Sequence, residues 1–264
     1  MDSRLQEKVV LITGAAGGFG RAIAKGFAER GSHLALLDIN AAGLEELAGA
    51  LRASGVSVQT AIADLSTEQG VREGIAEALA RFERRVDVLV ANVGLLIADA
   101  CEHLTSEQWH RAFSINFFSH VWAVNAVVPL MKARGGGSIV FVGSDQGLQP
   151  DSGLAPYAVA KAATHSFMKI LARELPPSGI WVNAVAPGMS RTPLVEALMA
   201  KYALEFGTDA REAERLELQR RGVPLARLGE PEEVARAVIF LASEPFSNGA
   251  ILDFSGGNVR SVAG

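Results

Sequence analysis

The sequence predicts an α/β fold in which one doubly wound, seven-stranded parallel sheet carries helices on both faces. Short apolar runs alternate with helical patterns along nearly the whole 264-residue chain. This alternation is typical of βαβ units, which build parallel sheets. Hydrophobic residues make up 49% of the chain, which is enough to fill a sheet that is buried on both faces. We therefore expect a single domain over residues 1–264.

Each expected strand is a short run dominated by apolar residues, as in a sheet that helices cover on both sides. The strands are expected near residues 8–13, 33–38, 57–62, 87–91, 138–143, 180–185 and 250–253. The helices are expected near residues 19–30, 41–54, 67–83, 106–133, 157–174 and 231–242. The run Pro176-Pro177-Ser178-Gly179 should end the helix 157–174, because proline and glycine interrupt helices.

The segment 189–222 departs from this alternation. Its first part has apolar residues at helical spacing, namely Leu194, Val195, Leu198, Met199 and Tyr202. A charged helix is expected after them, from Asp209 to Arg221. Because a long segment between strands often closes over a substrate, we expect a substrate lid at 189–222. The apolar face that Met189 begins would favour a moderately apolar substrate, cyclic ones included.

A glycine-rich turn follows the first strand, with the sequence Thr13-Gly14-Ala15-Ala16-Gly17-Gly18-Phe19-Gly20. A strand, such a turn and a helix, in this order, bind the pyrophosphate of a dinucleotide in a Rossmann fold. Gly14 allows the tight turn, Gly18 leaves room for the phosphates, and Gly20 lets the helix pack against the strand. On its own, a turn of this kind can also be a purely structural loop.

The acidic residue Asp38 ends the second strand, eighteen residues after Gly20. A carboxylate at this distance accepts hydrogen bonds from the adenosine ribose hydroxyls. It would also repel a 2′-phosphate, and no Arg or Lys between Gly14 and Gly20 would attract one. The sequence therefore favours NAD over NADP as the cofactor.

Tyr157 and Lys161 lie four residues apart in an uninterrupted helical stretch, and Ser144 precedes Tyr157 by thirteen residues. Side chains at i and i+4 share one face of a helix. A cation beside a phenol favours the phenolate, so we expect Lys161 to lower the pKa of Tyr157 from its usual ~10 toward neutrality. A phenol with such a pKa can exchange a proton with an alcohol or carbonyl oxygen near pH 7.

Taken together, these motifs resemble the short-chain dehydrogenase/reductase family, in the type called classical. The matching residues are Thr13-Gly14-x-x-x-Gly18-x-Gly20, Asp64-Leu65, Asn92-x-Gly94, Asn116, Ser144, Tyr157-x-x-x-Lys161 and Pro187-Gly188. The departures are Ala91-Asn92-Val93-Gly94 in place of Asn-Asn-Ala-Gly, and Asp253-Phe254-Ser255-Gly256-Gly257 in place of Val-Asp-Gly-Gly. Neither departure touches a proton-transfer group, so the resemblance implies an oxidoreductase with a nicotinamide cofactor.

The resemblance also implies roles around the cofactor. Asp64 would contact the adenine ring, with Leu65 beside it, and Phe19 of the turn belongs to the same set. Thr192 would bond the carboxamide, and Asn116 would hold a water that links Lys161 to solvent. For Asp64, a loop carboxylate near a helix start is an equally good reading. Asn116 could instead bond to local backbone and distort its helix.

Many of these residues share one position in the predicted fold, directly after a strand. They are Gly14, Asp38, Asp64, Asn92, Ser144 and Pro187. Because ligands of open parallel sheets bind beyond the carboxyl ends of the strands, we expect these residues to form one site. Backbone at Gly94 would approach the nicotinamide ribose, and Pro187-Gly188 would line the nicotinamide. The substrate would lie against Gln146, Leu96, Leu154 and Met189, which otherwise would be an exposed loop residue and ordinary core residues.

The expected reaction is reversible hydride transfer between NAD and a secondary alcohol or ketone. Tyr157 would act as general acid and base, and Ser144 would hydrogen-bond the reacting oxygen as charge builds on it. Lys161 would bond the nicotinamide ribose. Two other classes stay open. A lyase or epimerase on this scaffold would form product without nucleotide turnover, and a non-catalytic dinucleotide-binding protein would not need all four proton-transfer residues.

Bulk properties exclude other functions. The net charge of −4 lacks the basic excess of a nucleic-acid binder. The single Cys101 allows no internal disulfide, and the five histidines are too scattered for a catalytic metal site. The first eight residues are polar, unlike a signal peptide, and no apolar run reaches the ~20 residues of a membrane span. We expect a cytoplasmic enzyme, and the resemblance implies a homotetramer, with a dimer as the alternative.

Overall fold

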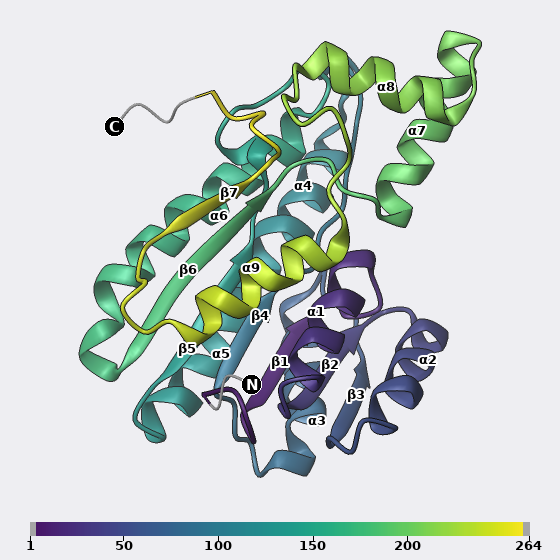
Figure 1. The fold of residues 1–264 in the computed structure, drawn as a ribbon. Coiled ribbons are helices and arrows are strands. Elements are labelled where there is room, and N and C mark those ends of the chain that lie inside the picture. Colours follow the sequence, from purple (N-terminus) through teal and green to yellow (C-terminus); the bar gives the residue numbers. More distant parts are fainter. Residues whose placement is uncertain (1–3, 261–264) are drawn as a thin grey trace.

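Seven strands lie side by side in one sheet, in the order β3-β2-β1-β4-β5-β6-β7, and their pairings are all parallel. The computed structural model describes residues 4–260, so the two ends of the predicted domain lie outside the described residues. The chain runs outward from β1 to β3 and then returns to place β4 beside β1 (Figure 1). The predicted doubly wound, seven-stranded parallel sheet is therefore confirmed, with its topological switch point between β1 and β4.

The strands are β1 (Val9–Thr13), β2 (His33–Asp38), β3 (Val58–Ile62), β4 (Val88–Ala91), β5 (Gly137–Val142), β6 (Ile180–Pro187) and β7 (Ile251–Phe254). The helices are α1 (Gly18–Ala28), α2 (Ala41–Arg52), α3 (Glu68–Ala78), α4 (Ser106–Phe113), α5 (Ser119–Ala133), α6 (Ala155–Glu174), α7 (Pro193–Phe206), α8 (Ala210–Arg221) and α9 (Pro231–Ser243). Each expected strand is present within two residues of its predicted bounds. The predicted helix 67–83 is shorter, because α3 ends at Ala78 and a separate turn follows.

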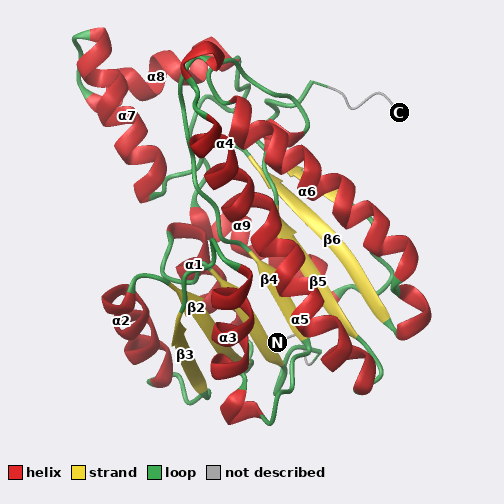
Figure 2. Ribbon diagram, turned by 180° about the vertical axis from the view of Figure 1, so that it is seen from behind, coloured by secondary structure: helices red, strands yellow, loops and turns green. Residues whose placement is uncertain are grey.

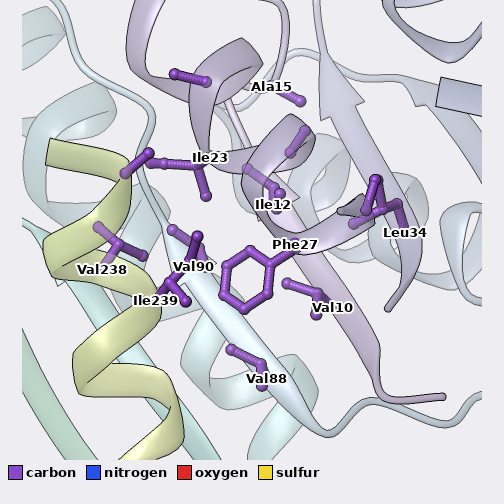
Figure 3. Packing of buried hydrophobic residues seen from close by; sticks show 14 of the residues in the cluster. Val10, Ile12, Ala15, Ile23, Phe27, Leu34, Val88, Val90, Val238 and Ile239 are labelled. Carbon is purple, nitrogen blue, oxygen red and sulfur yellow. The ribbon is translucent and has the colours of Figure 1, made fainter. Parts of the chain in front are cut away.

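Alternate residues of each strand supply two apolar layers, one on each face of the sheet. Val10 and Ile12 of β1 share one apolar layer with Phe27 of α1 and Val238 of α9, and Figure 3 shows Phe27 beside Val10. Leu11 of β1 points to the opposite layer, which α3, α5 and α6 cover. Figures 1 and 2 show these two helical layers in front of and behind the sheet. Burial on both faces explains why the strands read as apolar runs instead of alternating patterns.

The predicted helix 106–133 consists of α4, a π-helical turn from Ser114 to Phe118, and α5. The π-helical turn contains Asn116, which is fully buried. By length and average hydropathy the stretch Ser106–Ala133 could cross a membrane. Polar residues such as His110 and Arg111 interrupt it, so it is not a continuous apolar run. One such helix is weak evidence, because a core helix passes the same test, and α5 buries Ala123, Val124 and Val127 against the sheet.

Helices α7 and α8 project beyond the carboxyl ends of the strands, at the top of Figure 1. Both helices were expected within 189–222, from apolar spacing and from charge. Each begins at a side chain that accepts a hydrogen bond from the backbone, Thr192 for α7 and Asp209 for α8. Each ends at a glycine with positive φ, Gly207 and Gly222. Only a residue without a Cβ adopts this conformation readily, so the two glycines fix where the helices stop.

Candidate active site

The glycine-rich turn between β1 and α1 is shaped to receive an anion. Gly14 has a φ of +65°, and a Cβ on it would lie 2.8 Å from the Cα of Val93. Gly17 occupies the N-cap of α1 and has no side chain that could cap the helix. The first N–H groups of α1 are therefore left for another acceptor, as they are where a helix holds a pyrophosphate. The turn thus fits a dinucleotide.

The remaining glycines of this turn permit close packing. A Cβ on Gly18 would lie 2.8 Å from Cγ2 of Thr192, so the turn touches the start of α7. A Cβ on Gly20 would collide with the carbonyl oxygen of Gly14. Phe19 is partly buried and packs against the apolar layer of α1 and α9. Gly18 therefore brings the predicted lid and the predicted phosphate site together.

Asp38 ends β2 with both carboxylate oxygens engaged by backbone. Oδ2 accepts from the N–H of Ala16 in the glycine-rich turn at 2.9 Å, and Oδ1 accepts from the N–H of Asn40 at 2.9 Å. The carboxylate is thus fixed beside the turn. Arg21 was overlooked in the sequence because it follows the turn by one residue. Its guanidinium donates to the carbonyl of Ala16 at 3.0 Å and pairs with Glu46 of α2 at 3.0 Å.

Asn92 joins the carboxyl ends of the two central strands. Its Nδ2 donates to the carbonyls of Thr13 and Gly14 at 3.0 and 2.9 Å, and its N–H donates to Oγ1 of Thr13 at 3.0 Å. The side chain therefore supports the glycine-rich turn. Gly94 is exposed, and a Cβ on it would lie 3.3 Å from Oδ1 of Asn116 and 3.6 Å from Nζ of Lys161. Three of the predicted residues meet at this point.

Asn116 holds the segment that carries Gly94. Its Oδ1 accepts from the N–H of Leu95 at 2.9 Å, and its Nδ2 donates to the carbonyl of Leu95 at 2.8 Å. Nδ2 also donates to the carbonyl of Ala112 at 2.9 Å, one helical turn earlier. Local backbone bonding in a distorted helix, the alternative reading of this residue, is therefore what the structure contains. The water-holding role stays a prediction, and it is compatible with this geometry because a carbonyl oxygen can accept twice.

Lys161 is a buried cation close to Tyr157. Its Nζ donates to the carbonyl of Val142, the last residue of β5, at 2.9 Å, and lies 5.8 Å from the centre of the Tyr157 ring. Burial lowers the pKa of the Lys161 ammonium from 10.5 to about 7. Two buried histidines face the same ammonium. Burial, together with that positive charge, lowers the pKa of His120 to about 3 and that of His165 to about 4, so both rings are neutral at pH 7.

The expectation that Lys161 lowers the pKa of Tyr157 is wrong for this structure. Burial raises the pKa of the Tyr157 hydroxyl to about 12. A hydrogen bond with Ser144 and the charge of Arg221 oppose that rise, whereas the charge of Asp145 adds to it. The physical reason is that desolvation of the phenolate outweighs the hydrogen bond of Ser144 and the charge of Arg221. Spacing on a helix places the two side chains on one face but does not reveal how far the surrounding elements desolvate the phenol.

Ser144 lies at the end of β5, and the short helical turn η4 (Asp145–Gly147) follows it. Its Oγ accepts from the N–H of Gln146 at 3.2 Å and donates to Oδ1 of Asp145 at 3.1 Å. Oδ2 of Asp145 accepts from Nδ2 of Asn258 at 2.8 Å. Asp145 is buried, with 3% of its surface exposed. Asn258, 113 residues away, has no sequence signal that would have found it.

Gln146 is equally buried, at 3% exposed, so it is not the exposed loop residue of the alternative reading. Its Oε1 accepts from the N–H of Asp151 at 2.8 Å. Because a backbone N–H can only donate, this bond fixes which end of the amide is oxygen. The Nε2 group has no hydrogen-bond partner among the described residues. An unpaired buried amide costs about 1–3 kcal/mol, which a ligand oxygen would recover.

The other predicted residues occupy varied places. Pro187 ends β6, and a Cβ on Gly188 would lie 2.8 Å from the Cα of Ser255. The carboxylate of Asp64 is exposed and accepts from the N–H of Ser66 at 2.9 Å, a local loop contact that leaves adenine binding a prediction. Leu65 is buried in the core, so its side chain faces away from solvent.

The predicted substrate contacts differ in exposure. Leu154 is 4% exposed, whereas Leu96 and Met189 are partly exposed. Met189 also lines a cavity of about 260 Å³ with Leu225, Phe254 and Ser255. Within residues 4–260 no three His, Cys, Asp or Glu side chains gather as metal ligands would.

Comparison with known proteins bears on this site. The family model described as short chain dehydrogenase matches residues 8–203. The 2,3-dihydro-2,3-dihydroxybenzoate dehydrogenase of Bacillus subtilis is 36% identical over 242 residues, which are 90% of each chain.

Two solved structures share the fold closely. L-sorbose reductase from Gluconobacter frateurii, complexed with NADPH and L-sorbose, has a TM-score of 0.94 at 31% identity, covering 99% of this chain and 100% of that one. The 3-ketoacyl-(acyl-carrier-protein) reductase from Brucella melitensis, complexed with NADH, has a TM-score of 0.83 at 31% identity, covering 97% and 100%. The two complexes hold different nicotinamide dinucleotides, so the likeness supports the class of cofactor and leaves the choice between NAD and NADP undecided.

Proposed function

Because the chain belongs to the short-chain dehydrogenase family, we propose that it oxidises a secondary alcohol, or reduces the corresponding ketone, with NAD(H). The observation that carries this proposal is the convergence of Ser144, Tyr157, Lys161 and Asn116 beyond the carboxyl ends of β4 and β5. Gly94 lies against both Asn116 and Lys161, and Ser144 hydrogen-bonds Tyr157. A bound nicotinamide supplies or accepts the hydride in such a reaction, and these residues handle the proton.

The proton passes through the hydroxyl of Tyr157 in this proposal. During reduction Tyr157 donates its proton to the carbonyl oxygen. During oxidation it accepts the proton of the substrate hydroxyl as a phenolate, a form that burial disfavours and that the positive charge of a bound NAD⁺ would favour. Ser144 donates a hydrogen bond to the same oxygen when negative charge develops on it. Lys161, whose pKa is about 7, is present as both ammonium and amine near neutral pH, so it can take part in proton exchange there.

Replacement of Tyr157 by phenylalanine tests this proposal. We expect Tyr157→Phe to lower kcat by about 10²–10⁴-fold, since general acid–base catalysis supplies a factor of that size. Turnover is followed as the change of NADH absorbance at 340 nm, with a panel of secondary alcohols and ketones. Tyr202→Phe, which alters the other tyrosine of the chain, is the matched control and should stay active. Unchanged turnover in Tyr157→Phe would contradict the proposed role.

The same assay separates the alternative classes. A lyase or epimerase would convert its substrate with no net change in NADH, and a binding protein would bind the dinucleotide without converting any compound. Either outcome would be measured with the wild-type chain, at a dinucleotide concentration at which binding has been shown.

We propose NAD rather than NADP as the cofactor, on the position of Asp38. Its carboxylate is fixed beside the glycine-rich turn by the N–H of Ala16, where it would face a 2′-phosphate. Arg21 lies next to the same turn, but its guanidinium pairs with Glu46. This pairing reduces the attraction that Arg21 would offer to a phosphate.

Two variants test the cofactor proposal. Asp38→Ala should move the ratio of kcat/KM for NAD and NADP toward NADP by about tenfold or more, because it removes a repulsion of roughly 1–4 kcal/mol. Glu46→Ala should move it in the same direction by freeing Arg21. Glu45→Ala, on the same helix but paired with Arg52, should leave the ratio unchanged. An unchanged ratio in Asp38→Ala would contradict the role of Asp38.

For the substrate, we propose a small secondary alcohol or ketone with a second oxygen atom. The unpaired Nε2 of Gln146 supports this, since it needs an acceptor and lies two residues from Ser144. Leu96, Leu154 and Met189 would supply apolar walls, and α7 and α8 would close as the lid. Two relatives named above act on oxygenated rings or sugars by their names, which agrees with this class. We further propose a cytoplasmic homotetramer.

A further inference from the structure

Asp145 is a buried carboxylate that touches the predicted catalytic serine. It is 3% exposed, and each of its oxygens has one partner group: Oγ of Ser144 at 3.1 Å and Nδ2 of Asn258 at 2.8 Å. The N–H of Gln146 donates a hydrogen bond to Oγ of Ser144 at 3.2 Å. A hydroxyl has one hydrogen to donate and two lone pairs. In the resting site the Ser144 hydrogen points to Asp145 and one lone pair accepts from Gln146, so Ser144 can donate to Tyr157 or to a substrate oxygen only when that hydrogen turns away from Asp145.

Asn258 is held as firmly as the carboxylate that it contacts. It is 5% exposed and lies in the segment after β7, far from Asp145 in the sequence. Its backbone carbonyl accepts from Nε2 of Gln149 at 3.0 Å, and Oε1 of Gln149 accepts from the N–H of Arg260 at 2.9 Å. Two side chains that follow Ser144 are thus tied to the segment after β7. The position of the serine hydroxyl depends on that segment.

The charged groups that face Tyr157 come from three elements. Asp145 of η4 is a carboxyl group whose pKa is raised by burial, Arg221 of α8 is positive, and Lys161 of α6 is positive only below its pKa of about 7. Arg221 is held by Glu217 at 2.7 Å and lies 3.5 Å from Asp151. Two carboxylates therefore screen its charge. The charge of Asp145 has no such counterion in direct contact, because Ser144 and Asn258 are neutral.

We propose that Asp145, held by Asn258, is a positioning residue that orients the Ser144 hydroxyl and places a negative charge beside Tyr157. The proposal extends the active site to the segment after β7, and it rests on the proposed function for its kinetic part. The electrostatic part does not need turnover. A carboxylate beside a phenol disfavours the phenolate, so removal of the charge should make Tyr157 more acidic.

The composition of the chain permits a direct measurement, because Tyr157 and Tyr202 are its two tyrosines. In a Tyr202→Phe background the phenolate absorbance at 295 nm reports Tyr157 alone. We expect Asp145→Asn to shift the rise of this absorbance to lower pH by about one unit. Asp99→Asn, an exposed carboxylate next to His103, is the matched control and should not shift it. Circular dichroism at each pH identifies the range in which the variants are folded.

Kinetics complete the test. Asp145→Asn and Asn258→Ala should each lower kcat about tenfold, and the double variant should lose little more than Asp145→Asn, because both changes act on one contact. The pH profile of kcat/KM for oxidation should move to lower pH in Asp145→Asn. An unshifted phenolate titration, or a fully additive double variant, would overturn the inference. Absence of cofactor-dependent turnover in the wild-type chain would refute the proposed function, while the titration still decides the charge effect.

Discussion

At the scale of single residues, Lys161 shows that a group suited to catalysis can weaken the fold. Lys161 is 2% exposed and its ammonium donates to the carbonyl of Val142, while burial lowers its pKa to about 7. In the unfolded chain the same group keeps a pKa near 10.4. Between pH 7 and 10.5 the unfolded state therefore binds more protons than the folded state. Stability should rise with pH over this range, because proton binding favours the unfolded chain.

Lys161→Met should accordingly stabilise the folded protein while abolishing activity. At pH 7 or below we expect a gain of about 2–4 kcal/mol in the free energy of unfolding, from ~1.4 kcal/mol per unit of pKa less the lost hydrogen bond. The gain should shrink between pH 7 and 10.5. Urea unfolding at several pH values measures it, and Lys169→Met, which alters an exposed lysine, should show no such dependence. A destabilised Lys161→Met at pH 7 would contradict this account of Lys161.

How far single residues can be predicted from sequence depends on whether the requirement is local. Gly14 was identified because a glycine in a tight turn indicates a positive φ, and the structure gives it a φ of +65°. Asn258 was not, because its contact with Asp145 spans 113 residues and needs only an amide. The predicted shift of the Tyr157 pKa had the wrong direction, because desolvation by elements distant in sequence outweighs any effect of Lys161 on the same helix.

At the scale of elements, helices and strands were predicted well where apolar runs and helix-ending residues in the local sequence define them. The turn at Pro176–Ser178 and Gly179, with a φ of +71°, ends α6 as expected. The π-helical turn at Ser114–Phe118 was not predicted as such, because it exists where Asn116 bonds the carbonyl of Ala112 and the backbone of Leu95. The contact with Leu95 is tertiary, so the helical pattern of 106–133 alone does not reveal it.

Helix α8 is fastened to the loop after Ser144 mainly by Arg220, with Arg221 at 3.5 Å from the same Asp151. Arg220 donates to both carboxylate oxygens of Asp151 at 3.2 and 2.7 Å, and Asp151 in turn binds Oε1 of Gln146 through its N–H. A lid that closes over the substrate would use this contact. The lid itself stays a prediction.

Arg220→Met should loosen that contact. We expect a loss of about 1–3 kcal/mol, because Arg220 also pairs with the buried Glu217, together with faster proteolysis of 189–222 and a higher KM. Arg215→Met on the same helix is the matched control, because Arg215 pairs with Glu212 within α8. Limited proteolysis with and without dinucleotide makes the comparison. Equal cleavage rates in the two variants would argue against a fastening role.

At the scale of the whole molecule, α6 presents an exposed stripe with apolar residues. Val159 and Ile170 are 48% and 52% exposed, and they lie on one face because eleven residues make three helical turns. Phe118, just before α5, is 42% exposed and stacks on Trp122. Such surfaces suit an isologous contact between copies of the chain, which supports the proposed homotetramer.

Ile170→Asp should therefore reduce the assembly to smaller species, because a charge in an apolar contact stays unpaired. Size-exclusion chromatography with light scattering measures the mass of the particle. Leu204→Asp on α7, whose side chain is 86% exposed, is the control and should leave the mass unchanged. Identical masses for wild type and Ile170→Asp would exclude α6 from the contact.

The packing of α1 against α9 has a consequence for folding during synthesis. Phe27 and Ile23 find Val238 and Ile239 only after some two hundred further residues have been synthesised, which takes ~10–40 s at ordinary elongation rates. During that interval the apolar face of α1 in the nascent chain stays exposed. Chains that end before α9 would leave this apolar face uncovered, so they should aggregate.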